Sequence, residues 1–462
     1  MSLSSDNTRQ GFSLDPPDSA ARKLAVGWLS LALGSLVVGG VYTLLIVLSR
    51  TPGIQDVFPW VDFFHTALVV HVDMTVLVWF LSFAGVFWSL NSNGKCQACA
   101  WSALVLCITG TGIITLAPFL GAGDPLMNNY VPVLQDPIFF VGLGVFGLGF
   151  ATMVMYGLFF SRPVGSYISS SGALRFGLYT ALIIALVSVF ALLASWYGMP
   201  EFAEGKTYFE LLFWGSGHTI QFIHVQLMMV AWLWLATASS TGLNIGPRLA
   251  LLLFALGVAP ALLTPFLYLA YDVGSASHLL GFTWLMQFGG GLAVLPMALM
   301  IILALLKTGG AGEDVRAERN ALVFSIILFG AGGIIGFMIH GSNVTVPAHY
   351  HGSIVAVTLA YMGVTYHILP YLGFNKPIGK MVSWQPVIYG VGQLMHVLGL
   401  AWSGGYGVQR KTAGADQGLE NIQQIAGMGI MGLGGLIAII GGIMFLVIVF
   451  KAMWPQQRVI QN

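Results

Sequence analysis

Long apolar runs recur along the whole chain and are separated by short polar segments. About 20 mostly apolar residues are enough to cross a bilayer as a helix. Twelve runs reach this length, at about 24–49, 62–92, 97–120, 132–161, 173–197, 208–240, 248–271, 278–306, 320–340, 345–372, 383–403 and 425–452. The pattern predicts an all-α integral membrane protein with twelve transmembrane helices. The expected domains are a tail over 1–23, a helical membrane domain over 24–452 and a second tail over 453–462.

The composition excludes an ordinary soluble domain, because 57% of the residues are hydrophobic and only 8% are charged. Residues 1–22 are polar and lack the apolar core of a cleavable signal peptide. Cys96, Cys99 and Cys107 are too few for a disulfide framework, and we interpret the pair Cys96 and Cys99 as structural. We expect no nucleic-acid partner.

The distribution of positive charge predicts the orientation of the helices. If the N-terminus is cytoplasmic, all but four of the 18 Lys and Arg residues fall in cytoplasmic segments. The four exceptions are Arg50, Lys206, Arg410 and Lys411. Membrane proteins concentrate Lys and Arg in their cytoplasmic loops. We therefore expect both termini in the cytoplasm.

Two histidines, His349 and His351, lie near the start of the apolar run over 345–372. Ionisable residues within a membrane helix are functional candidates. Residues i and i+2 leave a helix about 200° apart and about 3 Å apart along its axis. The two rings cannot bind one ion, but they could hold two different metal centres side by side. The alternative is a pair of core histidines bonded to neighbouring carbonyl groups.

Most of the remaining histidines fall in the same half of the membrane. On the predicted orientation, the outer half contains His65, His71, His218, His278, His340 and His396 in addition to the pair at 349 and 351. Core histidines would be scattered through both halves. The clustering therefore favours buried metal centres near the periplasmic face.

Three histidine motifs, each within or beside a long apolar run, resemble those of a known family. The run over 208–240 contains Phe213-Trp-Gly-Ser-Gly-His218, His71 precedes a long apolar run, and His349-Tyr-His351 begins the run over 345–372. In these features the chain resembles catalytic subunit I of the haem-copper oxidase superfamily, which includes bacterial nitric oxide reductases. It is most similar to the divergent reductases known as sNOR and gNOR. The resemblance implies a subunit I-like bundle of twelve helices.

The resemblance implies two haems and one non-haem metal. His349 would bind the iron of a high-spin haem, while His351 and His71 would bind the iron of a low-spin haem. His65 is the alternative to His71, because some members carry His-Thr at this site. His218 would bind the non-haem metal, and neutral imidazole suits both copper and iron.

Two departures from the oxidase pattern bear on the substrate. Oxidases commonly have a tyrosine four residues after the histidine that corresponds to His218, where this chain has Phe222, although Tyr268 or Tyr271 could substitute. The family's adjacent histidine pair on helix 7 is absent, and Asp272 stands near its expected place. A carboxylate ligand would shift the preference of the site towards iron. The alternative is that Asp272 only opens a loop.

Other segments add weaker indications. His278 is a further candidate ligand of the non-haem metal. The stretch from His340 to His349 resembles the corresponding stretch of nitric oxide reductases, with one extra residue. Arg410 and Lys411 resemble the family's basic pair that meets the haem propionates, although a solvated loop would also explain them.

The preferred hypothesis is a catalytic subunit of a respiratory nitric oxide reductase in a bacterial inner membrane. It would reduce two NO to N2O and water. The chain has no dicopper motif and no attached cytochrome, so electrons must come from a partner subunit with a cytochrome c or dicopper domain. The first alternative is an oxygen-reducing terminal oxidase. The second, from another class, is a membrane transporter or a haem-binding protein without turnover.

Overall fold

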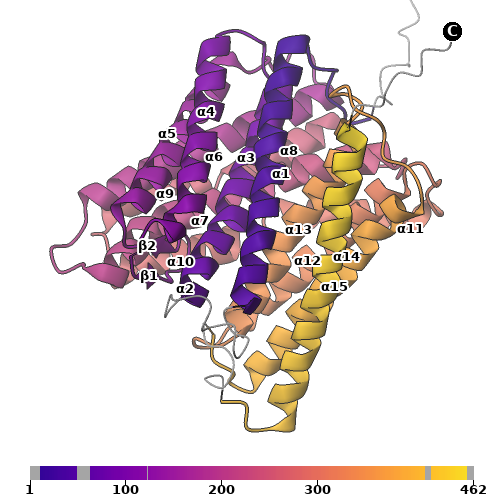
Figure 1. Cartoon of the computed structure of the whole chain (residues 1–462). Coiled ribbons are helices and arrows are strands. Elements are labelled where there is room, and N and C mark those ends of the chain that lie inside the picture. The colour runs from indigo at the N-terminus through magenta and orange to yellow at the C-terminus, as the bar shows by residue number, and fades with distance from the viewer. Residues whose placement is uncertain (1–10, 49–62, 122, 411–417, 455–462) are drawn as a thin grey trace, which may run out of the picture. The chain divides into compact units, whose positions relative to one another are not determined.

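The computed structural model describes residues 11–48, 63–121, 123–410 and 418–454, which are almost wholly helical (Figure 1). The chain forms two compact units. Unit 1 contains residues 1–13, 228–245 and 295–462, and unit 2 contains residues 14–227 and 246–294. The elements are α1 (Ser19–Leu48), α2 (Phe63–Val72), η2 (Asp73–Val78), α3 (Trp79–Leu90), α4 (Gln97–Leu116), η3 (Ala117–Phe119), β1 (Pro125–Leu126), β2 (Val133–Leu134), α5 (Pro137–Phe160), α6 (Ser170–Tyr197), α7 (Gly205–Ala238), α8 (Pro247–Val258), η4 (Ala261–Leu263), α9 (Thr264–Ala270), α10 (Ala276–Gly289), α11 (Val294–Lys307), α12 (Arg316–Phe337), α13 (Thr345–Ile368), α14 (Lys380–Gly405) and α15 (Ile422–Met453).

Helix forms in each of the twelve predicted ranges. Within the described residues, ten helical segments are both long enough and apolar enough to cross a membrane. The ranges 345–372 and 383–403 correspond to α13 and α14, which are helices of 24 and 26 residues but are not among the ten. The all-helical membrane class is therefore confirmed, whereas the count of twelve membrane crossings stays a prediction.

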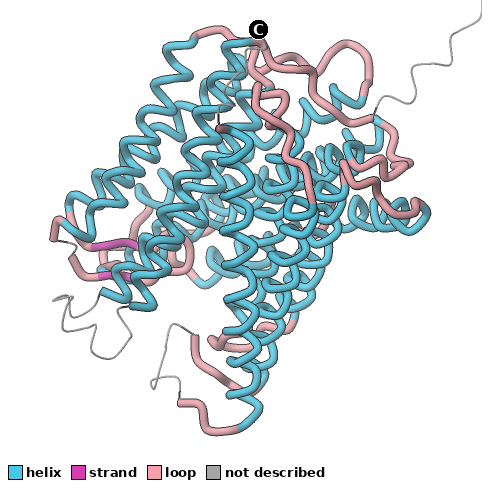
Figure 2. The backbone as a smooth tube through the Cα atoms, turned by 45° about the vertical axis from the view of Figure 1, so that its right-hand side comes forward, coloured by secondary structure: helices cyan, strands magenta, loops and turns pink. Residues whose placement is uncertain are grey.

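The expected helix over 132–161 begins later than the apolar pattern predicts. The side chain of Asp136 accepts a hydrogen bond from the backbone N–H of Ile138 at 2.8 Å and caps α5, which starts at Pro137. The preceding residues, Val133 and Leu134, instead pair with Pro125 and Leu126 in a short antiparallel hairpin (Figure 2). Apolar character alone does not distinguish a short buried strand from the first turn of a helix.

Two expected helices are interrupted. The range 278–306 forms α10 and α11, which are separated at Gly290 to Ala293. The range 248–271 forms α8, η4 and α9, with Pro260 and Pro265 at the junctions. Proline lacks the N–H that an α-helix needs, so a change of helix type at these positions is expected.

The first helix begins at Ser19 rather than at 24, because Asp18 caps it. The Asp18 carboxylate accepts hydrogen bonds from the backbone N–H groups of Ala20 and Ala21 at 3.0 and 2.9 Å, and it lies 3.6 Å from Arg162. The polar residues before 24 thus supply part of α1, and the domain boundaries stay a prediction. Most of the predicted C-terminal tail, residues 455–462, lies outside the described residues.

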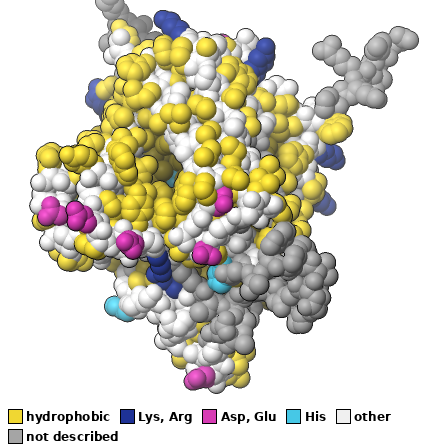
Figure 3. All heavy atoms as spheres, turned by 60° about the vertical axis from the view of Figure 1, so that its left-hand side comes forward, with side chains coloured by type: hydrophobic (Ala, Val, Ile, Leu, Met, Phe, Trp, Pro, Cys, Tyr) yellow, Lys and Arg dark blue, Asp and Glu magenta, His cyan; other side chains and the backbone are white. Residues whose placement is uncertain are grey.

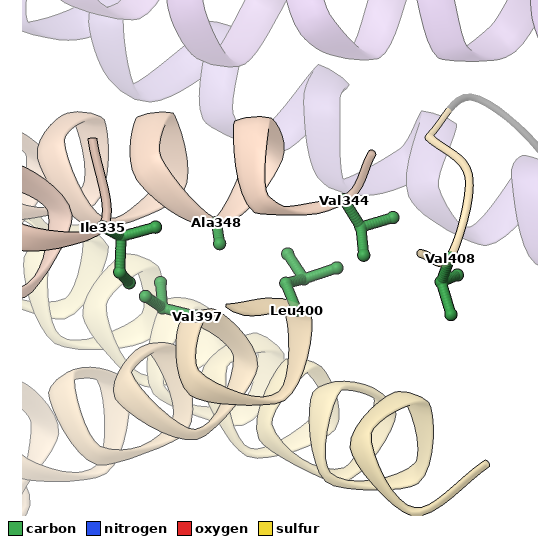
Figure 4. Close-up of a cluster of buried hydrophobic side chains, with 6 residues drawn as sticks. All are labelled: Ile335, Val344, Ala348, Val397, Leu400 and Val408. Carbon is green, nitrogen blue, oxygen red and sulfur yellow. The ribbon is translucent and has the colours of Figure 1, made fainter. Parts of the chain in front are cut away.

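In unit 1, the start of α13 is held by a buried hydrophobic cluster. Ala348 of α13 faces Val397 and Leu400 of α14, and Ile335, Val344 and Val408 complete the cluster (Figure 4). Ala348 directly precedes His349, so the packing of the cluster holds the helix that carries the His-x-His pair.

The surface is typical of a protein that meets lipid. Hydrophobic side chains cover most of the face drawn in Figure 3, with only scattered charged groups. In unit 2, for example, Leu148, Phe159 and Leu193 are each more than half exposed. Extensive exposed apolar surface is rare on soluble monomeric proteins.

Cys96 and Cys99 form a disulfide at the start of α4.

Candidate functional site

In unit 1, the rings of His349 and His351 contact different neighbours. The His349 Nδ1 atom lies 2.8 Å from the carbonyl oxygen of Gly332 on α12. The His351 Nδ1 atom lies 2.8 Å from the carbonyl oxygen of Pro347, and its ring centroid lies 5.0 Å from that of His396 on α14. The two side chains therefore leave α13 towards different helices, as their spacing predicts.

These hydrogen bonds define which nitrogen could bind a metal. A carbonyl oxygen can only accept, so the Nδ1 atom of each ring carries the proton and Nε2 carries the lone pair. Metal-binding histidines usually donate their other N–H in this way. The donor chemistry of His349 and His351 therefore fits the binding of haem iron through Nε2.

A short contact between two loops places Arg410 near the start of α13. Asn343 and Gln409 form a β-bridge, and the backbone N–H of Val344 donates to the carbonyl of Val408 at 2.9 Å. Arg410 Nε donates to Ser342 Oγ at 3.1 Å. Lys411, the other residue of the predicted basic pair, lies outside the described residues.

In unit 2, His71 has the same pattern of bonding as His349 and His351. Its Nδ1 atom lies 2.9 Å from the carbonyl oxygen of Gly39 on α1 and 3.1 Å from the hydroxyl of Thr43. The partly buried His65 instead lies edge-on to Phe64, with ring centroids 5.0 Å apart. The donation to Gly39 leaves Nε2 of His71 as the ligand nitrogen, which supports His71 as the candidate.

A π-helical turn, η2, begins directly after this region at Asp73. Such turns occur frequently at functional sites. Asp73 is 1% exposed, and neither of its carboxylate oxygens has a hydrogen-bond partner in the described part of the chain.

The second site in unit 2 surrounds His218 on α7. Its Nδ1 atom lies 2.8 Å from the carbonyl oxygen of Trp214, one turn earlier. The side chain is 6% exposed, and its ring lies 4.7 Å from that of Trp214 and 5.8 Å from that of Phe282. Here too the Nε2 atom carries the lone pair, which suits a non-haem metal.

Tyr130, which lies in none of the sequence motifs, contacts His218 directly. Its hydroxyl oxygen lies 2.8 Å from Nδ1 and 3.0 Å from Nε2 of the imidazole. Burial raises the pKa of the Tyr130 phenol well above its usual value, and the nearby Glu210 carboxylate raises this pKa further. The phenol is therefore protonated at neutral pH and can donate a hydrogen bond.

The glycines that precede His218 on α7 make room for aromatic rings. A Cβ atom on Gly217 would run into the ring of Tyr130, and one on Gly215 would run into Tyr268 and Phe282. This explains in physical terms why small residues precede His218.

His278 and Asp272 differ sharply in their environments. His278 is fully buried, and neither of its ring nitrogens has a hydrogen-bond partner in the described part of the chain. Its ring lies 5.1 Å from that of Phe282, which also contacts His218. Asp272 is exposed, and its backbone carbonyl accepts from the N–H of Ser275 in a turn. Among the described residues, no three His, Cys, Asp or Glu side chains are close enough together to hold a metal.

Two tyrosines, Tyr268 and Tyr271, lie near the position at which the family commonly has an adjacent pair of histidines. The Tyr268 hydroxyl lies 2.7 Å from Ser195 Oγ, and its ring lies 5.0 Å from that of His278. Tyr271 is 43% exposed. Tyr268 therefore lies against the ring of a candidate ligand, His278.

Comparison with known families identifies the family to which the chain belongs. Residues 23–444 match the family model described as cytochrome c and quinol oxidase polypeptide I. The chain belongs to this family. It is therefore a catalytic subunit of the haem-copper oxidase type and an oxidoreductase. The family generally binds haems together with a copper or iron centre.

Proteins similar to this chain occur in two bacteria. An uncharacterized protein of Rickettsia prowazekii (strain Madrid E) is 27% identical over 93% of this chain and 96% of its own length. An uncharacterized protein of Aquifex aeolicus (strain VF5) is 30% identical over 78% of this chain and 88% of its own length. Both similarities extend over most of the helical domain.

Proposed function

We propose that this chain is the catalytic subunit of a bacterial inner-membrane nitric oxide reductase, with both termini cytoplasmic and its metal centres towards the periplasm. The observation that carries the proposal is Phe222, a fully buried phenylalanine one helical turn after His218, where oxidases commonly have a tyrosine. Reduction of dioxygen by four electrons requires an extra local electron, which the reduction of NO does not.

The histidine environments support a specific set of ligands. His349 would hold a high-spin haem, His71 and His351 a low-spin haem, and His218 a non-haem iron or copper, each through Nε2. Asp272 and His278 are the further candidate ligands of this metal. The burial of His278 favours His278 over Asp272. Arg410, with Lys411, would meet the haem propionates.

These groups would supply the redox chemistry for reducing two NO with two electrons and two protons to N2O and water. The protein's part is to orient the groups and to exclude water. Electrons would enter from a partner subunit with a cytochrome c or dicopper domain.

Oxygen reduction is the second candidate, and a specific observation favours it. The hydroxyl of Tyr130 lies against His218, so a phenol is present at this site even though position 222 lacks one. A tyrosine from another segment of the chain could take part in the reduction of dioxygen.

Assays on the purified complex separate the two candidates. Haem and metal contents are measured first, followed by NO and dioxygen consumption with the same electron donor. We expect two haems, one non-haem metal, and N2O formation much faster than dioxygen consumption. Rapid dioxygen consumption with negligible N2O formation would contradict the proposal, and a colourless protein would exclude both candidates.

A further inference from the structure

The disulfide between Cys96 and Cys99 is accessible at the point where α4 begins. Cys96 directly precedes α4 and is exposed, whereas Cys99 lies in the first turn and is half-buried. Cys107, about two turns further along the helix, is fully buried. A thiol in solution therefore reaches the disulfide but does not reach Cys107.

The disulfide lies on the side of the membrane that the distribution of positive charge assigns to the cytoplasm. Lys95 directly precedes it, and Arg162 of the neighbouring loop donates from Nε to the carbonyl of Ser92 at 3.0 Å. Disulfides are rare in the cytoplasm, and those that occur there are usually transient and redox-active. This step rests on the proposed orientation, in which both termini are cytoplasmic.

The loop before the disulfide is held in place by other contacts. The backbone N–H of Asn93 donates to the carbonyl of Phe160 at 2.8 Å. The backbone N–H of Arg162 donates to the carbonyl of Asn91 at 2.7 Å. A disulfide stabilises a fold mainly by closing a loop of the unfolded chain, and the gain is small when the cysteines are three positions apart. The fold therefore does not depend on this bond.

The backbone of Cys96 shows what the bond does hold. Its φ of 46° and ψ of 54° lie in the left-handed region, which residues with a side chain rarely adopt. Once the bond is reduced, Cys96 is free to leave this conformation, and the first turn of α4 loses its fixed start. The later turns stay packed on α5, where a Cβ on Gly149 would lie 2.7 Å from the Cys107 sulfur.

The start of a helix also favours the thiolates that disulfide exchange requires. The first backbone N–H groups of a helix have no partner within it, and the helix dipole places partial positive charge there. Helix N-termini and neighbouring Lys side chains stabilise cysteine thiolates, and Lys95 is adjacent to Cys96. A stabilised thiolate is also a faster leaving group.

Metal binding is the other common use of a Cys-x-x-Cys pair, and the structure does not favour it. A structural zinc site takes four protein ligands. Over the ranges that the structure describes, no three His, Cys, Asp or Glu side chains form a group that could hold a metal. Two thiols alone are half of such a site.

We propose that Cys96 and Cys99 are a reversible redox site that exchanges with cytoplasmic thiols of the glutathione class, and that its reduction loosens the first turn of α4. The first thiolate attacks the exposed sulfur of Cys96 and forms a mixed disulfide. The bond between the two cysteines breaks, and its electron pair leaves on the sulfur of Cys99, which takes up a proton.

A second thiolate completes the reduction. It attacks the sulfur of the first thiol in the mixed disulfide, and Cys96 leaves as a thiolate that takes up a proton. The protein thereby gains two electrons and two protons, and two thiols become one disulfide. Oxidation by glutathione disulfide is the same sequence in reverse.

The test is a glutathione titration of the full-length protein in inside-out membrane vesicles. Free thiols are labelled with a membrane-impermeant maleimide and located by mass spectrometry. An increase of about a hundredfold in [GSH]2/[GSSG] across the midpoint should take the pair from about one tenth to about nine tenths reduced. The change should reverse when glutathione disulfide is added, and Cys107 should stay unlabelled throughout. Amide hydrogen exchange of residues 97–100 should be faster in the reduced protein.

Two variants separate the pair from the third cysteine. Cys99→Ser should leave Cys96 labelled at every glutathione ratio, with the fast amide exchange of the reduced wild type. Cys107→Ser is the matched control and should titrate as the wild type does.

A disulfide that persists over the whole glutathione range and is reduced only in the denatured protein would overturn the proposal, as would thiols that never oxidise. Equal amide exchange in the two states would overturn the link to the first turn of α4. Labelling in right-side-out vesicles alone would overturn the orientation together with this inference. A pair that titrates as expected in a protein without NO reductase activity would contradict only the proposed function.

Discussion

A Cβ atom on Gly336 would lie 2.7 Å from the Nδ1 atom of His349, across the α12–α13 contact. This separation is shorter than real Cβ atoms tolerate, and the neighbour that would have to move is the ring itself. The glycine is therefore part of the pocket that sets the orientation of His349. The same ring donates to Gly332, one turn earlier on α12, and would lose that hydrogen bond if it were displaced.

Gly336→Ala is predicted to displace the proposed ligand of the high-spin haem. We expect the high-spin signal in the optical spectrum of the purified protein to fall, while the low-spin signal persists because His351 points elsewhere. Gly333→Ala on the same helix is the control, since a Cβ there would meet nothing within 4 Å. Equal high-spin haem content in the two variants would contradict the assignment of His349.

His71→Ala should abolish the low-spin haem signal and leave the high-spin haem in place. Its Nδ1 hydrogen bond to Gly39 presents Nε2 as the ligand nitrogen. His65→Ala, a partly buried histidine less than two turns earlier, serves as the control and should keep both signals. If His65→Ala loses the low-spin signal and His71→Ala retains it, the ligand is His65.

The non-haem metal can be tested by metal analysis of three variants. His218→Ala should lower the bound metal and turnover with both haems retained. We expect His278→Ala to lower the metal content more than Asp272→Ala does, because His278 is buried with unsatisfied ring nitrogens and Asp272 is exposed. Burying such nitrogens is costly unless a partner binds them.

The opposite order of metal loss would support a carboxylate ligand. In that case Asp272→Ala would lose the metal and NO reductase activity with unchanged haem spectra, as the sequence position of Asp272 suggests. A fully metallated His278→Ala protein would exclude His278 from the site.

Much of the helical framework could be predicted from the sequence, because apolar runs of spanning length are a strong signal. The range 345–372 became α13 at Thr345–Ile368, and the divergence of His349 and His351 follows from helical periodicity alone. The breaks at Pro260 and after Gly289 also have sequence signals, since proline and runs of glycine disrupt helices.

The contact of Tyr130 with His218 could not be predicted in the same way. The two residues are 88 positions apart, and no local pattern encodes a pairing at that separation. The residues after Tyr130 are apolar and merge with α5 in the hydrophobic pattern, so the pattern predicts helix where the second strand of the hairpin lies. Asn128 and Asn129 indicate a turn, but not which helix the turn contacts.

The last prediction concerns the packing of α14 against α15, which lie side by side in unit 1 (Figure 1). Gly434 on α15 sits against Gly392 and His396 on α14, and an added Cβ would lie 2.6 Å from the Gly392 carbonyl oxygen. Backbone cannot move aside as a side chain can, so Gly434→Ala must push the helices apart. Overpacking of this kind costs about 1–3 kcal/mol.

The displacement should also reach the proposed low-spin haem site, because His396 donates to the Met431 carbonyl on α15 at 3.0 Å and lies beside His351. We therefore expect Gly434→Ala to lower the thermal unfolding temperature in detergent and to broaden the low-spin haem band. Gly432→Ala places its Cβ in open space on the same helix and should change neither. A lower unfolding temperature with an unaltered low-spin band would show that this packing affects stability but not haem binding. In that case His396 does not lie next to the haem.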